Sequence, residues 1–407
     1  MMGQSENPLL HQAPAPNLWD RAYRALSNVL SDDGRGSDVL DDAVATWRQS
    51  RHLSYDAARE AFAELLSARS SDLQIGAMLW LTQPEFLNVE EIAGFASVLR
   101  ERAAPLTHNK PGTHALGDTC GTGGDTVPTF NISTTIMFVL AGAGIPIAKH
   151  GNRAFTSRCG SADVLQELGV AIDLEPEKVD ACLKKTGMAF MYAPVFHSAT
   201  KKVQHIRRVL ATNMPKDLQR RSVFNVLGPL SNPARTPWQL IGVWNSEVLE
   251  KLAGALGLLE VRRALVVHGL CEGESEERGL DEASILGTTK VAELSDDASV
   301  ASYELERHDF GFEGSPPAAV EVGGGDVPAN AQTLWGILAG EIKGPKLDLV
   351  LANAALGLYL ASSPQDDRPI KAQLSDRVGQ ARQIIASGAA KQKFVEFRDA
   401  TRELAES

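Results

Sequence analysis

Three short segments between residues 121 and 161 carry side chains suited to binding phosphate groups. Residues 121–125 (GTGGD) form a glycine-rich turn. Residues 131–135 (NISTT) lead directly into the apolar run 136–143. Residues 149–153 (KHGNR) follow a short β-branched stretch at 145–148. Each segment lies where a turn meets a strand or a helix.

Each segment has a physical reason to attract an anion. Glycines allow successive backbone N–H groups to converge, because no Cβ blocks the approach or forbids positive φ. Asn131, Ser133 and Thr134 are N-cap residue types, and a helix start offers free N–H groups and the positive end of its dipole. Lys149 and Arg153 add cations at the end of an expected strand, where ligands collect in open α/β sheets. Alone, the segments are typical of a tight turn, a helix cap and a basic surface turn. Together they predict a site for a polyanion.

The elements that would position these segments fall into two groups. Trp19, Ala22, Leu26 and Leu30 recur at helical spacing. Further helices are expected at 55–68, with Ser54 as N-cap, and at 72–81 and 89–102. We therefore expect a small all-helical domain over residues 16–107, after a disordered lead-in at 1–15. Helices from about 195–220 are expected to join it.

From residue 116 onward, short β-branched stretches alternate with helical segments, and glycines stand at the junctions. This alternating pattern predicts a larger α/β domain over 108–194 and 221–407, with a central, mainly parallel sheet flanked by helices. A strand is expected at 264–267. Helices are expected to start at 164 and to cover 178–184, 201–210, 347–360, 376–386 and 392–403. Residues 311–329 read as irregular, and 211–219 and 271–278 read as inserted loops.

Composition narrows the class of protein. The 407 residues carry a formal net charge of −11, which argues against a general nucleic-acid binder. The four cysteines are widely spaced and form no CxxC pair, which predicts reduced thiols in a cytoplasmic protein. They are Cys120, Cys159, Cys182 and Cys271. The longest apolar run is too short to span a bilayer, and no secretory signal is expected.

The three segments, in this order and spacing, resemble the anthranilate phosphoribosyltransferases. That family carries GTGGD, TFNIST and KHGNR followed by S-x-x-G-S-A-D, found here at 121–125, 129–134, 149–153 and 157–163. The resemblance covers roughly residues 50 to 395. It implies transfer of the phosphoribosyl group of phosphoribosyl pyrophosphate (PRPP) to the amine of anthranilate, the second step of tryptophan biosynthesis. It also implies a homodimer formed through the helical domain.

The resemblance assigns residues to each ligand. For PRPP it implies Gly121, Thr122, Gly123, Gly124, Asp125, Thr129, Asn131, Ser133, Thr134, Lys149, Gly151, Asn152, Arg153, Ser157 and Ser161. For anthranilate it implies Gly121, His150, Asn152, Arg207 and Pro229. For two Mg²⁺ ions it implies Ser133, Asp281 and Glu282. No residue is assigned as general base, and His150 is expected either to shape the pocket or to move a proton.

The carboxylate pair Asp281-Glu282 and the arginine Arg207 have their own chemical reasons. Neighbouring carboxylates on a turn can converge on Mg²⁺, which fills its shell with substrate oxygens and water. Taken alone, such a pair is usually solvated surface, and the family's GLDE at this place favours a metal role. A guanidinium binds a carboxylate bidentately, which suits Arg207 for anthranilate. A salt bridge on a helix face is the simpler alternative, and Arg208 competes for the role.

Residues 221–233 (RSVFNVLGPLSNP) match a further family segment. Their prolines and glycine predict a fixed loop, in which Pro229 lines the path of the aromatic substrate. Asn225 and Asn232 are expected to be structural and to hold backbone groups.

Two other functions remain open at this point. A pyrimidine nucleoside phosphorylase-like enzyme would share the architecture and use free phosphate. A non-enzymatic relative of the same fold would bind nucleic acid instead.

Overall fold

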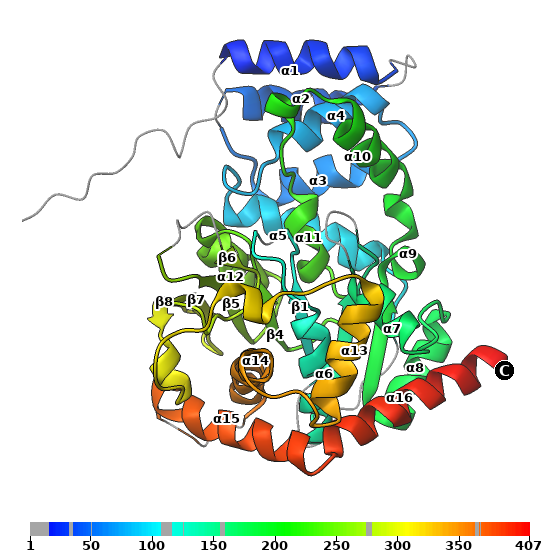
Figure 1. Ribbon diagram of the computed structural model, residues 1–407. Coiled ribbons are helices and arrows are strands. Elements are labelled where there is room, and N and C mark those ends of the chain that lie inside the picture. The colour runs from blue at the N-terminus through cyan, green and yellow to red at the C-terminus, as the bar shows by residue number, and fades with distance from the viewer. Residues whose placement is uncertain are drawn as a thin grey trace, which may run out of the picture. The chain divides into compact units, whose positions relative to one another are not determined.

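The computed structural model describes residues 16–31, 36–49, 51–106, 116–124, 126–154, 159–273, 279–362, 366 and 368–407. Residues 1–15, Asp125, Ser157 and residues 274–278 lie outside the described residues. The chain divides into a helical unit, Met1–Arg102 with His197–Leu227, and an α/β unit, Ala103–Phe196 with Gly228–Ser407. The expected fold class, a helical domain followed by a larger α/β domain, is confirmed (Figure 1).

The helical unit contains the expected helices and a further one, α2, that was not predicted. They are α1 (Pro16–Val29), α2 (Asp38–Arg48), α3 (Tyr55–Leu65), α4 (Asp72–Leu81), α5 (Val89–Arg102) and α10 (Lys201–Asn213). The Ser54 hydroxyl accepts a hydrogen bond from the Ala57 amide at 3.3 Å, as its N-cap role predicted. The Phe62 ring stacks on Phe95 at 5.1 Å and on Phe224 at 5.4 Å. The returning segment 197–227 thus contributes to the core of this unit.

The α/β unit is built on one sheet with the strand order β3-β2-β1-β4-β5-β7-β8, and β6 pairs with β5. Pairing is parallel from β3 to β5 and antiparallel beyond it. Since parallel strands point the same way, the carboxyl ends of β1, β2 and β4 meet at one edge. The strands are β1 (Gly117–Gly121), β2 (Ile147–Gly151), β3 (Met188–Tyr192), β4 (Trp238–Gly242), β5 (Arg263–Leu270), β6 (Gly279–Leu280), β7 (Thr289–Leu294) and β8 (Val300–Leu305).

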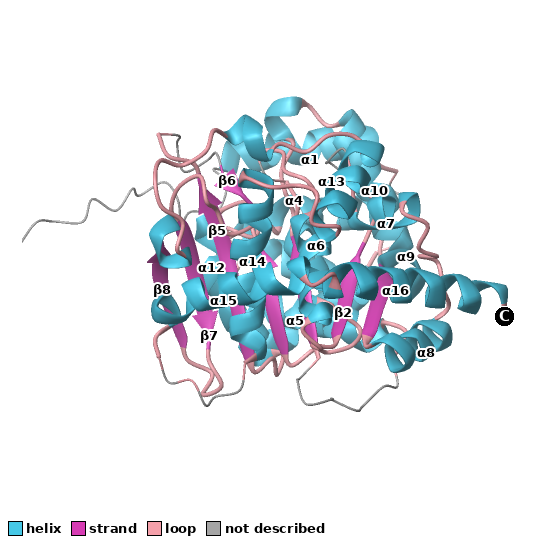
Figure 2. Ribbon diagram, turned by 60° about the horizontal axis from the view of Figure 1, so that its bottom comes forward, coloured by secondary structure: helices cyan, strands magenta, loops and turns pink. Residues whose placement is uncertain are grey.

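Helices surround this sheet, and α14, α15 and α16 lie in front of it in Figure 2. The longer ones are α6 (Ile132–Gly142), α8 (Pro176–Thr186), α12 (Leu249–Leu258), α13 (Val327–Leu338), α14 (Pro345–Ala361), α15 (Ile370–Ala386) and α16 (Ala389–Glu406). Shorter ones are α7 (Ser161–Glu167), α9 (Ala193–Phe196) and α11 (Phe224–Leu230), with single 3₁₀ turns at Ser198–Thr200, Lys216–Leu218, Ser246–Val248, Arg307–Phe310 and Ala319–Val322. No helix in the described ranges combines the length and apolar character needed to cross a bilayer.

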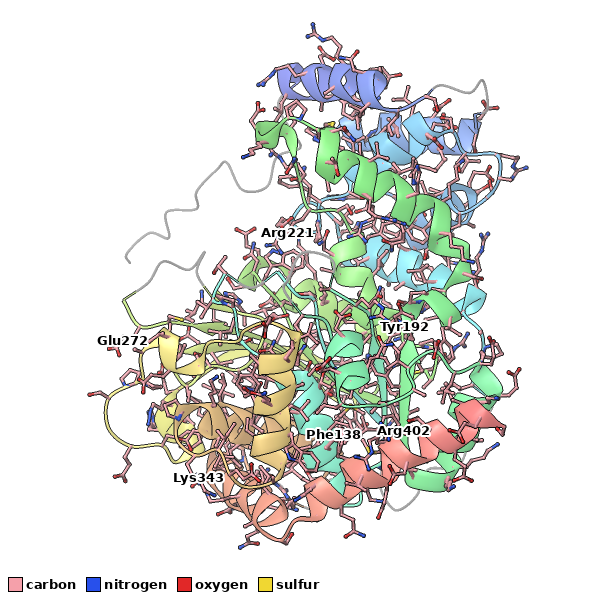
Figure 3. All side chains as sticks on the ribbon, turned by 45° about the vertical axis from the view of Figure 1, so that its right-hand side comes forward. Phe138, Tyr192, Arg221, Glu272, Lys343 and Arg402 are labelled. Atoms are coloured by element: carbon pink, nitrogen blue, oxygen red, sulfur yellow. The ribbon has the colours of Figure 1, made fainter. Side chains whose placement is uncertain are left out.

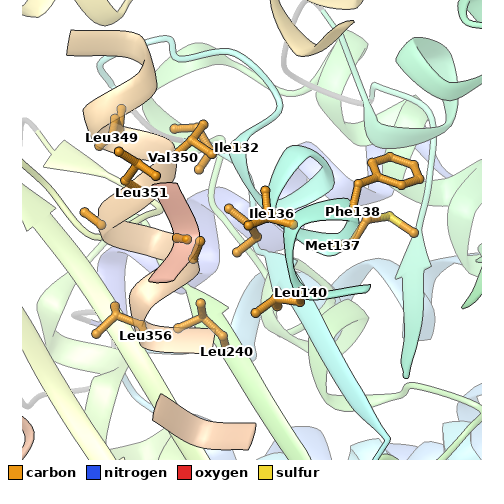
Figure 4. Packing of buried hydrophobic residues seen from close by; sticks show 14 of the residues in the cluster. Ile132, Ile136, Met137, Phe138, Leu140, Leu240, Leu349, Val350, Leu351 and Leu356 are labelled. Carbon is orange, nitrogen blue, oxygen red and sulfur yellow. The ribbon is translucent and has the colours of Figure 1, made fainter. Parts of the chain in front are cut away.

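Helix α6 stands at the centre of the core, which explains its continuous apolar sequence. Ile136 and Leu140 face Leu240 and helix α14, whereas Phe138 points the opposite way (Figure 4). The Phe138 ring meets Phe394 of α16 edge-on at 5.1 Å. A helix covered on every side has no polar face to preserve. The position of its first turn is therefore fixed by packing.

Three sequence expectations need correction. Residues 221–233 are not a loop throughout, because α11 occupies Phe224–Leu230 with Pro229 inside it. So short a helix loses only one possible hydrogen bond to that proline. Helix α7 begins at Ser161 and not at 164, because the Asp163 carboxylate accepts from the Gly160 amide at 2.9 Å and caps the first turn. The segment expected to be irregular includes a 3₁₀ turn and the start of α13 at Val327.

Candidate active site

The glycine-rich turn follows β1 at the edge where the parallel strands end. Gly123 and Gly124 have φ values of +67° and +84°, a conformation that other residues rarely adopt. The Thr122 amide donates to the Gly242 carbonyl at 2.9 Å, and the Gly123 amide donates to Asp281 Oδ2 at 2.7 Å. The turn is therefore held between the end of β4 and the carboxylate of Asp281.

The start of α6 lies beside this turn, but its capping differs from the prediction. Asn131 stands at the N-cap position without a side-chain capping bond. Its Oδ1 instead accepts from Asn330 Nδ2 and from the Cys159 thiol, each at 3.3 Å. Ser133 and Thr134 are already inside the helix. The Ser133 amide donates to Glu282 Oε1 at 3.1 Å, so a carboxylate from a distant loop occupies the helix start.

Lys149 reaches the same place from β2. Its side chain is buried, and its ammonium group donates to the Thr119 carbonyl and to the Ser133 hydroxyl, the latter at 3.2 Å. Thr119 in turn donates from its hydroxyl to the Ser133 carbonyl at 2.9 Å. A lysine buried this deeply keeps its charge at lower cost when hydrogen-bond acceptors surround it. The ends of β1, β2 and α6 are thus joined around one cation.

Asp281 and Glu282 enter from the segment after β6, and both are buried, at 9% and 7% exposure. The Asn353 side chain of α14 fixes the next residue, since its Oδ1 accepts from the Ala283 amide and its Nδ2 donates to the Ala283 carbonyl, each at 2.9 Å. A Cβ on Gly121 would lie 2.6 Å from Asp281 Oδ2. Glycine at 121 therefore serves close approach of this carboxylate.

Oxygen atoms of three side chains here are of the kind that Mg²⁺ binds. They belong to the Ser133 hydroxyl, which accepts from the Lys149 ammonium group, and to the Asp281 and Glu282 carboxylates, which accept from backbone amides. No cluster of three or more His, Cys, Asp or Glu side chains suited to a metal occurs among the residues that the structure describes. A cation here would complete its shell with water and substrate oxygens, which is how Mg²⁺ is commonly held beside a phosphate.

The opposite face of β1 carries a buried polar network that sequence reasoning missed. Asp118 is fully buried, and its Oδ2 accepts from Asn232 Nδ2 at 2.8 Å and from Gln239 Nε2 at 3.2 Å. Gln239 also donates to the Pro229 carbonyl at 3.0 Å, and His150 Nδ1 lies 2.9 Å from the Gly228 carbonyl. The segment bearing Pro229 is thus tied to β1, β2 and β4. Asn232 holds backbone groups, as expected.

Burial raises the pKa of the Asp118 carboxyl, and the nearby Lys149 ammonium opposes that rise. The available sequence signal was a polar residue inside a buried strand. Asp118 and Gln239 are direct neighbours across β1 and β4, a pairing that requires knowledge of the register.

The remaining residues of the KHGNR segment point to a different environment. Arg153 pairs with Asp163 at 3.0 Å, and its Nε donates to the hydroxyl of Tyr192, labelled in Figure 3 at the end of β3. The Tyr192 hydroxyl, followed by Asp163, raises the pKa of Arg153. Ser161 donates to the Asn152 carbonyl at 3.3 Å. The structure thus brings Arg153 to α7 and Lys149 to Ser133. Gly151 ends β2, and Thr129 forms a bridge with Gly323.

Arg207 belongs to the helical unit, on α10. It is half-buried, its Nη1 donates to Gln204 at 3.1 Å, and its guanidinium lies 5.5 Å from the centre of the Phe224 ring. Its neighbour Arg208 is exposed.

Comparison with known proteins agrees with this geometry. The model of the glycosyl transferase family a/b domain matches residues 113–391, and that of the family's helical bundle domain matches residues 42–103. Anthranilate phosphoribosyltransferase of Natronomonas pharaonis is 41% identical over 88% of this chain and 99% of its own length. The enzyme of Herpetosiphon aurantiacus is 40% identical over 89% of this chain and 99% of its own. The chain belongs to the anthranilate phosphoribosyltransferase family.

Solved structures of the family give the same fold. The enzyme from Thermus thermophilus superposes with a TM-score of 0.75 at 33% identity, covering 90% of this chain and 100% of that one. A Saccharomyces cerevisiae family member, solved in complex with PRPP and Mg, has a TM-score of 0.73 at 24% identity and covers 90% and 99%. The family membership indicated by the three sequence segments is therefore confirmed.

Proposed function

We propose that this protein is a Mg²⁺-dependent pentosyltransferase of tryptophan biosynthesis, which moves the 5-phosphoribosyl group of PRPP to the amine of anthranilate and releases pyrophosphate. One observation carries the proposal beyond family membership. The glycine turn, the start of α6 and Lys149 converge with Asp281 and Glu282 at a single edge of the sheet. Backbone N–H groups and a buried ammonium group can donate to a diphosphate, and two carboxylates can bind the metal ion that accompanies it.

The chain's own part in this reaction is positioning and electrostatic stabilisation. Apart from the Thr122 amide, which donates to the Gly242 carbonyl, the amides of residues 121–124 and of the first turn of α6 would bind phosphate oxygens. Lys149 would neutralise charge that develops as pyrophosphate departs. Ser133, Asp281 and Glu282 would hold Mg²⁺, which supplies charge neutralisation on the leaving diphosphate. Two ions in each site are proposed. The remaining residues assigned to PRPP by resemblance complete this proposal.

The acceptor side is proposed to comprise Gly121, His150, Asn152, Pro229 and Arg207. Anthranilate's amine is already a nucleophile, so these residues need only orient it, with Arg207 pairing to its carboxylate. His150 is held through Nδ1 at the Gly228 carbonyl, which favours a role in shaping this side over moving a proton. A cytoplasmic homodimer without nucleic-acid partners completes the proposal, and sedimentation equilibrium tests its stoichiometry.

The decisive assay follows the fluorescence of anthranilate as PRPP is added, with Mg²⁺ or with EDTA. We expect consumption only with both PRPP and Mg²⁺. The variant D281N/E282Q should retain its circular dichroism spectrum and lose the Mg²⁺-dependent rate. An unchanged Mg²⁺ dependence in that variant would remove the pair from the metal site. Phosphorolysis of thymidine or uridine, or salt-sensitive DNA binding without transferase activity, would favour the two alternative functions.

A further inference from the structure

The two carboxylates at the proposed metal site already occupy the groups that should bind the diphosphate. Asp281 Oδ2 accepts from the Gly123 amide at 2.7 Å, and Glu282 Oε1 accepts from the Ser133 amide at 3.1 Å. The first amide belongs to the glycine turn and the second to the start of α6. Both carboxylates are buried, so water competes poorly for these bonds. The protein thus carries two internal anions in its anion site.

This arrangement treats metal-free and metal-bound diphosphate differently. A metal-free diphosphate must displace both carboxylates and then lie beside their negative charges. When Mg²⁺ accompanies the diphosphate, each carboxylate can exchange its N–H partner for the cation, and the freed N–H can donate to a phosphate oxygen. An amide has one hydrogen to donate, so the two acceptors exclude one another.

The surrounding backbone limits this exchange to the side chains. Asn353 holds both backbone groups of Ala283. On the other side, the Gly279 amide donates to the Thr126 hydroxyl at 3.0 Å, and the Thr126 amide donates to the Gly279 carbonyl at 3.2 Å. The loop is therefore anchored to α14 and to the glycine turn on either side of the pair.

From this geometry we infer that Asp281 and Glu282 determine selectivity for metal-bound over metal-free diphosphate. Their carboxylates occupy the N–H donors of the diphosphate site until a cation binds the carboxylates instead. This role rests on the proposed function and adds to metal ligation. It differs from simple ligation in one consequence. Removing the two charges should strengthen binding of diphosphate when no metal is present.

Calorimetric titration of inorganic pyrophosphate into the full-length protein tests this role. Measurements are made in EDTA and in Mg²⁺ for the wild type, D281N/E282Q and D281A/E282A. The side chains introduced in D281N/E282Q keep a hydrogen-bond acceptor but carry no charge. D281A/E282A removes the acceptor as well as the charge. In EDTA we expect affinity to rise about tenfold or more in the amide variant and further in the alanine variant, since a hydrogen bond to a charged group is worth that order. In Mg²⁺ both variants should lose the metal-dependent gain of the wild type.

A matched control separates this effect from general loss of a buried carboxylate. Asp309 is also a capping carboxylate, which accepts from the Glu306 amide at 2.8 Å in the segment that packs against α15. D309N should leave pyrophosphate affinity in EDTA unchanged. Should the double variants fail to fold, each single variant, D281N or E282Q, frees one donor and should show part of the gain.

The outcomes are distinguishable. Unchanged or weaker binding of metal-free pyrophosphate by every folded variant overturns the inference while leaving the proposed transferase in place. A wild type that binds no pyrophosphate in Mg²⁺ refutes the proposed site and the inference with it. A gain in EDTA confined to the variants at 281 and 282 supports the inference.

Discussion

Replacing Asn232 with alanine tests how far the buried network under β1 supports the α/β unit. Asn232 is fully buried. Its Nδ2 donates to Asp118 Oδ2 at 2.8 Å and to the Ala148 carbonyl at 2.9 Å, and its Oδ1 accepts from the Ala234 amide at 2.8 Å. One side chain therefore makes three hydrogen bonds with groups of β1, β2 and its own turn.

The expected cost follows from these bonds. A typical hydrogen bond contributes about 1 kcal/mol, and leaving a buried partner unsatisfied costs about 1–3 kcal/mol. Three bonds lost from a site that water does not reach give about 3–5 kcal/mol. That is a large part of the stability of an ordinary domain, about 5–15 kcal/mol.

Asn245 supplies a matched control. Its side chain accepts from the Glu247 amide at 3.0 Å, so it makes the same turn bond to the residue two positions later, but at the surface and without a buried carboxylate. Asn245→Ala should cost about 0.5–1.5 kcal/mol. The free energies of unfolding are compared by urea titration, followed by tryptophan fluorescence and circular dichroism. A difference between the two variants below about 1 kcal/mol would refute the importance assigned to the network.

Three further perturbations address the acceptor substrate, pH and the metal loop. Arg207→Ala should raise KM for anthranilate by about 10–100-fold, which corresponds to the loss of a charge-assisted pair, and should leave KM for PRPP nearly unchanged. Substitution of its exposed neighbour, Arg208→Ala, should change neither KM. Equal effects of Arg207→Ala on both substrates would contradict the assignment. Burial raises the pKa of Asp118 above its unfolded value of 3.8, so its contribution to stability is complete below that pH and declines as pH rises. Asp118→Asn should therefore make the slope of the unfolding free energy against pH less negative above pH 3.8. Identical slopes in the variant and the wild type would count against this. A Cβ on Gly242 would overlap the Asp281 carbonyl, so Gly242→Ala should weaken Mg²⁺-dependent binding of pyrophosphate. Gly379→Ala should not, because a Cβ there meets no group outside the backbone of its own helix within 4 Å. Equal binding by both variants would rule out this steric coupling.

Local chemistry made much of the fold predictable. Helices α4 and α5 match their predicted limits, because local residues mark their ends. A capping box of Ser71 and Gln74 starts α4, and α5 has acidic residues in its first turn and basic residues in its last. The apolar run after Thr135 predicted α6 for the same reason. Predictions failed where a distant group competes with a local one. Asn131 is a good N-cap by type, yet Asn330 and Cys159 engage its side chain from 199 and 28 positions away.

The convergence of these segments on one site could not be predicted from the sequence. The bond from the Gly123 amide to Asp281 joins residues 158 positions apart, and that from the Ser133 amide to Glu282 joins residues 149 apart. Residue types indicated that each segment suits an anion or a cation. They did not indicate that the carboxylates expected to bind a cation would accept from the N–H groups expected to bind an anion. That pairing is produced by strand order and by the loop after β6.

Strand alternation explains why one stretch of β1 serves two sides of the site. Thr119 faces α6, where its hydroxyl donates to the Ser133 carbonyl and its own carbonyl accepts from Lys149. Asp118 faces the other way and holds Asn232 and Gln239. Successive residues of a strand point to opposite faces. The two adjacent polar residues of this buried strand therefore have separate roles. Thr119 supports the proposed diphosphate site, and Asp118 supports the segment that bears Pro229. Read from sequence alone, the pair DT in GDTCG looks like the approach to a glycine turn, and only the register with β2 and β4 separates the two roles.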